Sequence, residues 1–235
     1  IRLPNTEGTI RTQFSWKNGP YLELDYAFSK FDFSHLAPLG GAQLHGYGQI
    51  YGAIEGPTNG LKGGGYGRAR RFSTAGFYFA DAIQFQYELP DLKHLNFDLN
   101  DIKLGKSILN GRLDFDFNAP LSLNAHIETQ DSHAQDLMKI FFDLPGLDSH
   151  ASGMATINGP INNLAVKATL ELDKADLWGE AFPVGHASVL YQNRQLTAEH
   201  VNFTRKSGEE TVLFRGSLLS NGESNFEARL ANISI

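Results

Sequence analysis

The segment Gly111-Arg-Leu-Asp-Phe-Asp-Phe-Asn-Ala-Pro-Leu-Ser-Leu-Asn-Ala-His-Ile127 alternates apolar with polar side chains. Its alternating apolar residues are Leu113, Phe115, Phe117, Leu121 and Leu123. Asp114 and Asp116 stand between the first of these. Successive side chains of a β-strand point to opposite faces of the sheet. The segment therefore predicts strands with one apolar face and one acidic or polar face.

The same period-2 pattern recurs along the chain, at residues 21–33, 95–104 and 165–172. It predicts an all-β fold of roughly fifteen to eighteen strands, each about nine to eleven residues long. A sheet of that many strands closes, folds on itself or curls. Aromatic residues are spread along the strands instead of gathering at their ends, which argues against a membrane barrel. We therefore expect a long curled sheet, shaped like a taco, with an apolar inner groove.

The composition narrows the classes of function. The 235 residues carry a net charge of -6 and include no cysteine, which excludes thiol catalysis, cysteine-bound zinc and disulfides. The densest basic cluster, Arg68 with Arg70 and Arg71, stands alone, so we expect no nucleic-acid partner. No apolar stretch reaches the length of a membrane-spanning helix. The chain starts with Ile1 and ends within the alternating pattern, which suggests a fragment of a longer protein.

One short amphipathic helix is expected near residues 133–144. Leu137, Ile140, Phe141 and Leu144 follow helical spacing. Ser132 is a suitable N-cap, and Pro145-Gly146 would end the helix. The chain is then one continuous β segment over 1–235, with a β-rich part at 1–131, the helix at 132–145, and β repeats at 146–235. A soft boundary falls near residue 146.

The second half of the chain resembles a known repeat. A small-residue strand ends in Gly153-Met-Ala-Thr-Ile-Asn-Gly159 and is followed by Pro160-Ile-Asn-Asn-Leu164 and an alternating strand. A later segment, Leu213-Phe-Arg-Gly-Ser-Leu218, is similar to the strand that precedes the next repeat. Residues 135–220 thus resemble AsmA-like and TamB-like proteins of Gram-negative bacteria, which are bridge-type lipid transfer proteins.

That resemblance implies a periplasmic groove that conducts phospholipid between the inner and outer membranes. It also implies an inner-membrane anchor outside this chain. TamB-like members further imply a role in outer-membrane protein assembly, together with a β-barrel partner in that membrane. Such a groove binds phospholipid acyl chains without a cofactor, a metal or catalytic residues, so the chain is not expected to be an enzyme.

The residues expected to line the groove are the apolar members of the alternating strands. They are Leu22, Leu24, Leu95, Phe97, Leu99, Leu113, Phe115, Phe117, Leu121, Leu123, Val166, Leu170, Leu172, Phe203, Val212 and Phe214. Two alternatives stay open. The first is a module that assembles outer-membrane proteins by pairing its edge strand with a client strand. The second is a closed β-sandwich that binds carbohydrate or acts as an adhesin.

The remaining acidic residues and histidines are interpreted as surface groups and not as catalytic or metal sites. Asp98, Asp101, Asp114 and Asp116 are interpreted as a solvated outer face, in preference to a calcium site or a glycosidase pair. His126, His133 and His150 lack metal-ligand spacing and are expected at the surface or rim.

The glycine-rich residues 40–76 predict a bulged part of the sheet or a flexible loop. Within this region, residues 63–68 are interpreted as a loop with a basic rim, in preference to a phosphate cradle. Arg68, Arg70 and Arg71 are the residues that would meet a lipid headgroup there.

Overall fold

The structure is a computed structural model. It describes residues 4–16, 19–36, 44–74, 77–138, 147–177, 179–193, 195–204, 211–219 and 224–231. At some positions within these ranges only the backbone is described. No helix in the described residues is long and apolar enough to cross a membrane.

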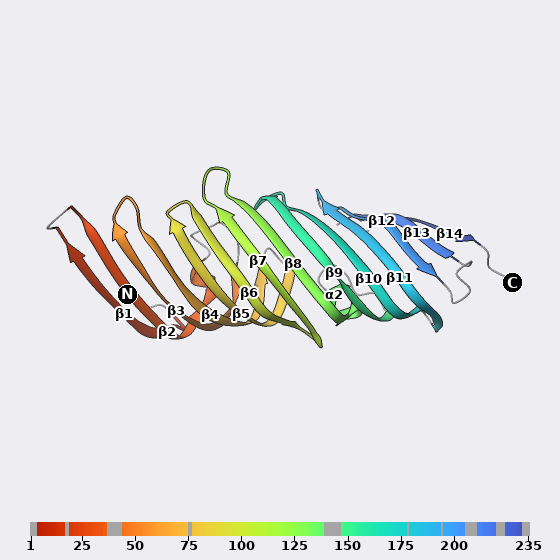
Figure 1. Ribbon diagram of the computed structural model, residues 1–235, viewed down its shortest axis with the longest axis horizontal. Coiled ribbons are helices and arrows are strands. Elements are labelled where there is room, and N and C mark those ends of the chain that lie inside the picture. Colours follow the sequence, from red (N-terminus) through yellow and green to blue (C-terminus); the bar gives the residue numbers. More distant parts are fainter. Residues whose placement is uncertain are drawn as a thin grey trace. The chain divides into compact units, whose positions relative to one another are not determined.

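The described strands form one 14-stranded sheet in which every strand lies beside the next one along the chain (Figure 1). The neighbouring strands from β1 to β6 and from β9 to β14, for which the residue register is defined, all pair antiparallel. The strands are β1 (Glu7–Ser15), β2 (Tyr21–Asp32), β3 (Leu44–Pro57), β4 (Lys62–Thr74), β5 (Phe77–Asp91), β6 (His94–Leu104), β7 (Ser107–Asp116), β8 (Ser122–His133), β9 (Leu147–Pro160), β10 (Ala165–Leu177), β11 (Glu180–Gln192), β12 (Gln195–Thr204), β13 (Thr211–Leu219) and β14 (Ser224–Ala231).

The expected all-β class and single long sheet are confirmed. The strands belong to one sheet, not to the two sheets of a sandwich. The described strands are fewer than the sequence predicted because several are longer than expected, and β5 reaches 15 residues. Residues 44–74 were expected to be a bulged or loop-like region, and they form two long strands. The loop interpretation is therefore wrong there, whereas the bulges occur near His45/Tyr47 and Phe72/Ser73.

Packing divides the chain into two compact units. The first comprises Ile1–Leu104 and Asn110–Asn124, and the second comprises Gly105–Leu109 and Ala125–Ile235. Each unit has its own buried residues.

A recurring irregularity marks the even-numbered strands. Arg71 in β4, Asp101 in β6, Asp131 in β8 and Lys174 in β10 all have φ between 50° and 52°. β2 shows a register shift at the corresponding part of the strand, after Phe28, and β12 shows one nearer its start, after Ala198. An extra residue in one strand bends it and increases its twist. These positions act as bulges that curve the strands.

Each bulge also shifts the alternation by one residue. In β6 the buried side chains are Leu99, before the bulge, and then Ile102 and Leu104 after it. In β10, Leu172 is followed by Ala175 in the same way. The shift keeps apolar side chains on one face although the sequence pattern changes phase. Without the bulge, Ile102 would point to the polar face.

Two short helical turns follow even strands. The 3-10 turn η1 (Phe33–Leu36) follows β2, and α2 (Ala134–Met138) follows β8. The helix thus begins one residue later than expected, and Leu137 is buried. Ser132 is not its N-cap, because it lies in β8, where its hydroxyl donates to the Ile108 carbonyl. The remainder of the expected helix, 139–146, lies outside the described residues.

Candidate functional site

The first unit brings apolar residues from six strands onto one face in register. Cross-strand pairs run Ile10–Tyr26, Tyr26–Gly52, Gly52–Gly65, Gly65–Tyr87 and Tyr87–Phe97. The next row runs through Phe28, Ile50, Gly67, Phe85 and Leu99. The ring of Phe97 then contacts that of Phe115 in β7, at a centroid distance of 5.9 Å. We call this surface the apolar face of the first unit.

Burial along this face changes from one end of the strands to the other. In β6, Leu99 beside the bulge is 3% exposed, whereas Leu95 and Phe97 are half-buried. In β5, Ile83 and Phe85 are buried, whereas Tyr87 and Leu89 are half-buried. The bulge end of the face is therefore closed, and the opposite end remains partly open to solvent.

The turn η1 closes the bulge end. Phe33 is 3% exposed and contacts Phe72 of β4 and Phe85 of β5, both at 6.1 Å between ring centroids. The carboxylate of Asp32 accepts hydrogen bonds from the Ser34 hydroxyl and backbone NH. These bonds hold the pKa of Asp32 below its usual value. The Phe33 ring acts as a plug over one end of the face.

Aromatic rings cover bare backbone in the middle of the face. A Cβ added at Gly52 or Gly65 would lie 2.0 Å or 2.4 Å from the Tyr87 hydroxyl oxygen, so the Tyr87 ring lies over these glycines. Burial raises the pKa of Tyr26, in the same row, to about 12. The absence of side chains at the two glycines therefore makes room for the Tyr87 ring against the backbone of β3 and β4.

The second unit has an apolar face of its own. One row pairs Ala151, Leu172, Gly185 and Phe203 in register. Leu172 and Phe203 are buried, whereas Val166 and Leu170, farther from the bulge, are half-buried. Phe182 packs against Phe203 at 5.3 Å between centroids. The second unit thus repeats the closed and partly open ends of the first.

The structure brings most of the expected groove residues onto these two faces. Leu22, Leu24, Leu95, Phe97, Leu99, Leu113, Phe115, Phe117, Leu121 and Leu123 belong to the first unit. Phe117 and Leu121 lie just outside β7 and β8, and Phe117 is 36% exposed. Val166, Leu170, Leu172 and Phe203 belong to the second unit. The backbones of Val212 and Phe214 pair with Phe203 and Val201, but their side chains lie outside what the structure describes.

The basic residues expected at a loop rim lie in strand β4. Residues 63–68 are strand, so the interpretation as a loop with a basic rim is wrong. Arg68 stands on the polar face, paired with Gln49 and Gln84. Arg70 and Arg71 are exposed at the bulge. The three arginines therefore do not form one cluster around a loop.

The acidic residues of the opposite face are solvated or locally paired. Asp98 and Asp101 are exposed, and Asp114 accepts a hydrogen bond from Arg112 at 3.0 Å. This contact raises the pKa of Arg112. Asp116 accepts from the backbone and side chain of Asn118. No metal-binding group of three or more His, Cys, Asp or Glu residues occurs in the described part of the chain.

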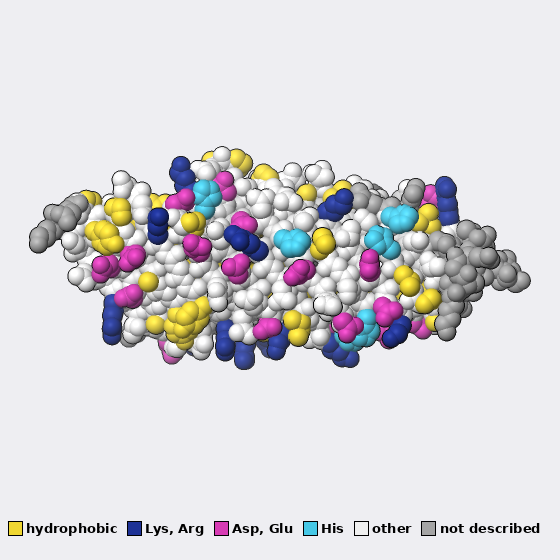
Figure 2. Space-filling view, viewed as in Figure 1, with side chains coloured by type: hydrophobic (Ala, Val, Ile, Leu, Met, Phe, Trp, Pro, Cys, Tyr) yellow, Lys and Arg dark blue, Asp and Glu magenta, His cyan; other side chains and the backbone are white. Residues whose placement is uncertain are grey.

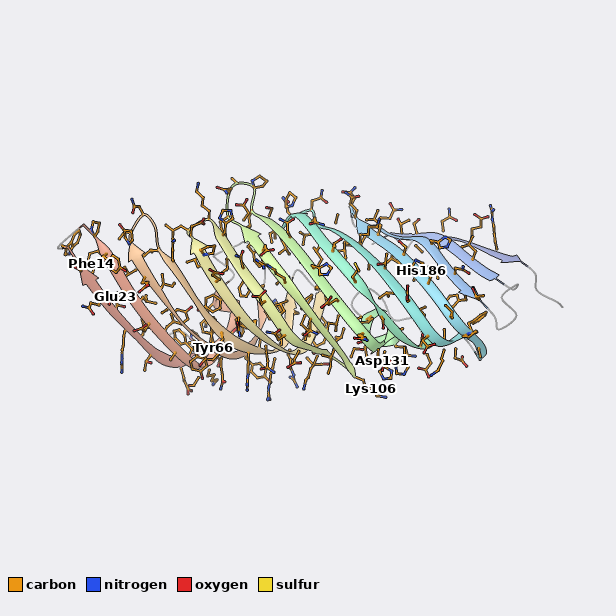
Figure 3. All side chains as sticks on the ribbon, in the orientation of Figure 1. Phe14, Glu23, Tyr66, Lys106, Asp131 and His186 are labelled. Carbon is orange, nitrogen blue, oxygen red and sulfur yellow. The ribbon has the colours of Figure 1, made fainter. Side chains whose placement is uncertain are left out.

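Figures 2 and 3 show the surroundings of these groups. Charged side chains and histidines are scattered among polar ones, and hydrophobic side chains are few, on the face that Figure 2 presents. Lys106, in the turn between β6 and β7, lies near Asp131 of β8 in Figure 3. Asp131 holds His150 at 2.7 Å, and the His150 ring lies 5.1 Å from that of His133. This histidine pair was not expected, because it depends on the register between strands.

Comparisons with protein-family models, curated proteins and solved structures gave no significant match to this chain. We therefore infer the function of the two apolar faces from the register and burial of their residues.

Proposed function

We propose that the apolar faces bind phospholipid acyl chains, as part of a periplasmic, inner-membrane-anchored protein of AsmA-like or TamB-like type that conducts phospholipid between the two membranes. The observation that carries this proposal is the half-buried state of registered apolar side chains such as Leu24, Tyr87 and Phe97. A protein core would bury them completely. A surface that receives a ligand leaves them partly covered.

The energetics favour such a ligand. Removing an acyl chain from water is worth about 0.8 kcal/mol per methylene, or about 12 kcal/mol for sixteen carbons. Rows of Leu, Ile, Phe and Tyr provide contacts of similar strength at every step, so a chain can slide along them. The polar face, with Glu23 and Asp98, keeps the outside of the sheet hydrated. Binding of this kind requires no catalytic group.

The experiment places the photoreactive amino acid p-benzoylphenylalanine at Phe115 or, as a control, at Arg112. Phe115 contacts Phe97 on the apolar face, and Arg112 is an exposed residue of the same strand. The purified chain is irradiated with vesicles of phosphatidylethanolamine and phosphatidylglycerol that carry labelled acyl chains. We expect lipid adducts at Phe115 and none at Arg112. Equal labelling at both positions, or none at Phe115, overturns the proposal.

A second candidate, pairing with a client strand during outer-membrane protein assembly, is favoured by β1. All nine residues of β1 are exposed, and in the described part of the chain it pairs with β2 alone. An unpaired strand edge accepts another strand through backbone hydrogen bonds. Photocrosslinking from Thr9 distinguishes the two functions: adducts with unfolded outer-membrane protein, and no lipid adducts at Phe115, favour this second candidate.

A further inference from the structure

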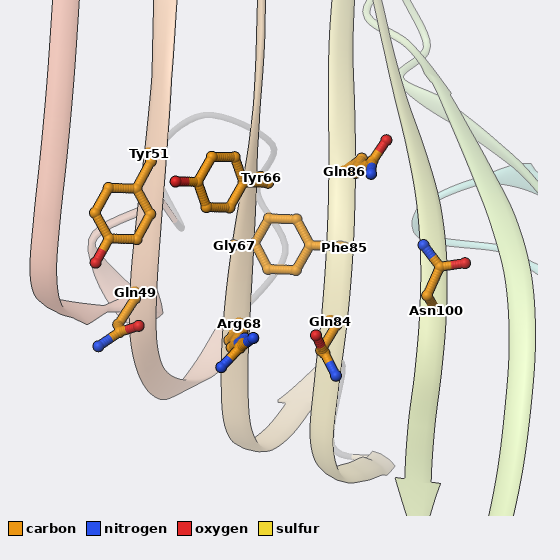
Figure 4. Close-up of a pocket in the computed structure, with 9 residues that line it drawn as sticks. All are labelled: Gln49, Tyr51, Tyr66, Gly67, Arg68, Gln84, Phe85, Gln86 and Asn100. Atoms are coloured by element: carbon orange, nitrogen blue, oxygen red, sulfur yellow. The ribbon is translucent and has the colours of Figure 1, made fainter.

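The polar face of the first unit carries an open depression that the lipid-binding proposal does not use. Its volume is about 430 Å³, and it lies across β3, β4, β5 and β6 (Figure 4). The residues that line it are Gln49, Tyr51, Tyr66, Gly67, Arg68, Gln84, Phe85, Gln86 and Asn100. The Phe85 ring lies against Gly67 on the opposite, apolar face, so the side chains available to a ligand come from the polar face.

Strand register assembles this depression from two adjacent rows. One row pairs Tyr51 with Tyr66 and Tyr66 with Gln86. The other row pairs Gln49, Arg68, Gln84 and Asn100 in succession. The row beyond the tyrosines holds the small residues Ala53 and Gly64 and then the exposed Glu88 of β5. The tyrosines therefore have amide and guanidinium groups on one side and the small residues Ala53 and Gly64 on the other.

The two tyrosine rings stack on each other with an offset, and we call this pair the platform. Their ring centroids are 5.1 Å apart and their planes differ by 23°. In Figure 4 both rings are seen almost face-on, spread over the strands instead of standing up from them. Tyr66 is 58% exposed. The exposed Tyr66 ring, and to a lesser degree the half-buried Tyr51 ring, thus offer aromatic surface to solvent.

The polar groups beside the platform are mostly planar donors and acceptors. Three glutamines and one asparagine line the depression, and no carboxylate does. Within the described residues, Arg68 forms no salt bridge. Its five N–H groups are therefore free to bind hydroxyl or anionic oxygens. Gln84 is oriented by donating to Asp101 at 3.3 Å.

We propose that this depression binds a glycan, with one sugar ring stacked on the exposed Tyr66 of the Tyr51–Tyr66 pair and an acidic group of a neighbouring sugar held by Arg68. A pyranose ring has a C–H face, which suits an aromatic platform, and a hydroxyl edge, which suits amides and guanidinium. Single-stranded nucleic acid also stacks on aromatic rings, but its phosphates need a basic groove. Here Arg68 is the one cation in the lining, and the chain carries a net charge of -6.

The experiment compares three probes by isothermal titration calorimetry and saturation-transfer NMR. They are chitotetraose, which is neutral and β-linked, a hyaluronan tetrasaccharide, which is β-linked and acidic, and an oligothymidine hexamer. We expect both glycans to bind, the acidic one at least threefold more tightly, and oligothymidine not to bind. Failure of both glycans to bind overturns the proposal, and binding of oligothymidine alone shows a nucleic-acid site instead.

Three variants separate the parts of the site. Tyr66→Ala should weaken both glycans at least tenfold, and Arg68→Gln should abolish the preference for the acidic one while chitotetraose still binds. Tyr78→Ala is the matched control, because Tyr78 is a 43% exposed tyrosine of the same unit that does not line the depression. Thermal melts establish that each variant folds. Equal losses in Tyr66→Ala and Tyr78→Ala, or an unchanged acidic preference in Arg68→Gln, refute the assigned geometry.

Discussion

Phe33, in the turn after β2, packs edge-on against Phe85 of β5, with 6.1 Å between the ring centroids and 73° between the ring planes. The turn thus reaches over β3 and β4 to touch a strand that is not a neighbour of β2 in the sheet. The contact closes the bulge end of the apolar face and leaves its other end partly open. The first unit therefore has a defined closed end instead of a uniformly exposed face.

Removing this plug should destabilise the first unit. Phe33→Ala deletes a ring that is 3% exposed, and we expect the free energy of unfolding to fall by about 3–5 kcal/mol. Phe14→Ala is the control, because Phe14 is 45% exposed, and its effect should stay within about 1 kcal/mol. Urea denaturation followed by circular dichroism measures both. Equal losses would show that η1 does not close the face.

The bulge in β10 makes Lys174 sensitive to side-chain shape. Its φ of 51° lies in the left-handed region, where a β-branched residue is strongly disfavoured. Lys174→Val should therefore cost about 1–2 kcal/mol, whereas Lys174→Gly should be close to neutral. The matched control is Lys167→Val, at an exposed site in β10 before the bulge, which should change stability by less than about 0.5 kcal/mol. Denaturation midpoints that do not separate Lys174→Val from Lys167→Val would contradict the bulge.

Gly105 lies in the turn between β6 and β7, against a buried carboxylate. Its φ is 59°, and an added Cβ would lie 2.4 Å from the Asp136 Oδ1 atom. Asp136 accepts hydrogen bonds from the Lys106 NH at 2.7 Å and the Ser107 hydroxyl at 3.3 Å. Gly105→Ala should cost about 2–4 kcal/mol, because it strains the turn and displaces those bonds.

Gly179 is the natural control for Gly105. It also has positive φ, at 88°, but an added Cβ would meet nothing within 4 Å. Gly179→Ala should therefore cost only the backbone strain, about 1 kcal/mol. Thermal unfolding of the two variants, measured in parallel, tests the difference. A loss in Gly179→Ala as large as in Gly105→Ala would mean that Asp136 is not responsible.

The contribution of Asp32 should depend on pH. Hydrogen bonds from Ser34 lower its pKa in the folded protein, so its stabilising effect is complete above the unfolded-state pKa of about 3.9. The effect is lost as the pH falls through the folded pKa. The stability difference between the native chain and Asp32→Asn should therefore be constant from pH 7 to about pH 5 and shrink below about pH 4. Urea titrations at pH 7, 5 and 3 measure it, and a difference that grows on acidification would reverse the sign assigned here.

Much of the sheet could be predicted from particular residues. The alternation around Leu113 and Phe115 indicated which side chains share a face, and Leu22, Leu24 and Phe97 lie where the pattern placed them. The pattern also contains a signal for the bulges. Leu99 is followed by apolar Ile102, three residues on, which breaks period 2 at the position where Asp101 takes a positive φ.

The glycine-rich strands were misjudged for a physical reason. Glycine has low intrinsic strand propensity, so residues 63–68 indicated a loop. In the structure, Tyr87 covers Gly52 and Gly65, and this packing comes from a strand far along the chain. Local propensity cannot report a contact of that kind. The assignment of Ser132 as the helix N-cap was wrong for a similar reason, since β8 continues through Ser132, whose hydroxyl donates to the Ile108 carbonyl.

By itself, the alternation of side chains determined the all-β class, the split into an apolar and a polar face, and most residues of each face, because strand geometry is local and has a period of two. Tertiary structure decided the rest. Register placed Tyr51 of β3 beside Tyr66 and Arg68 of β4, and the bulges with Phe33 determined which end of the apolar face is closed. These features depend on pairing and packing between strands, which the sequence of a single strand does not encode.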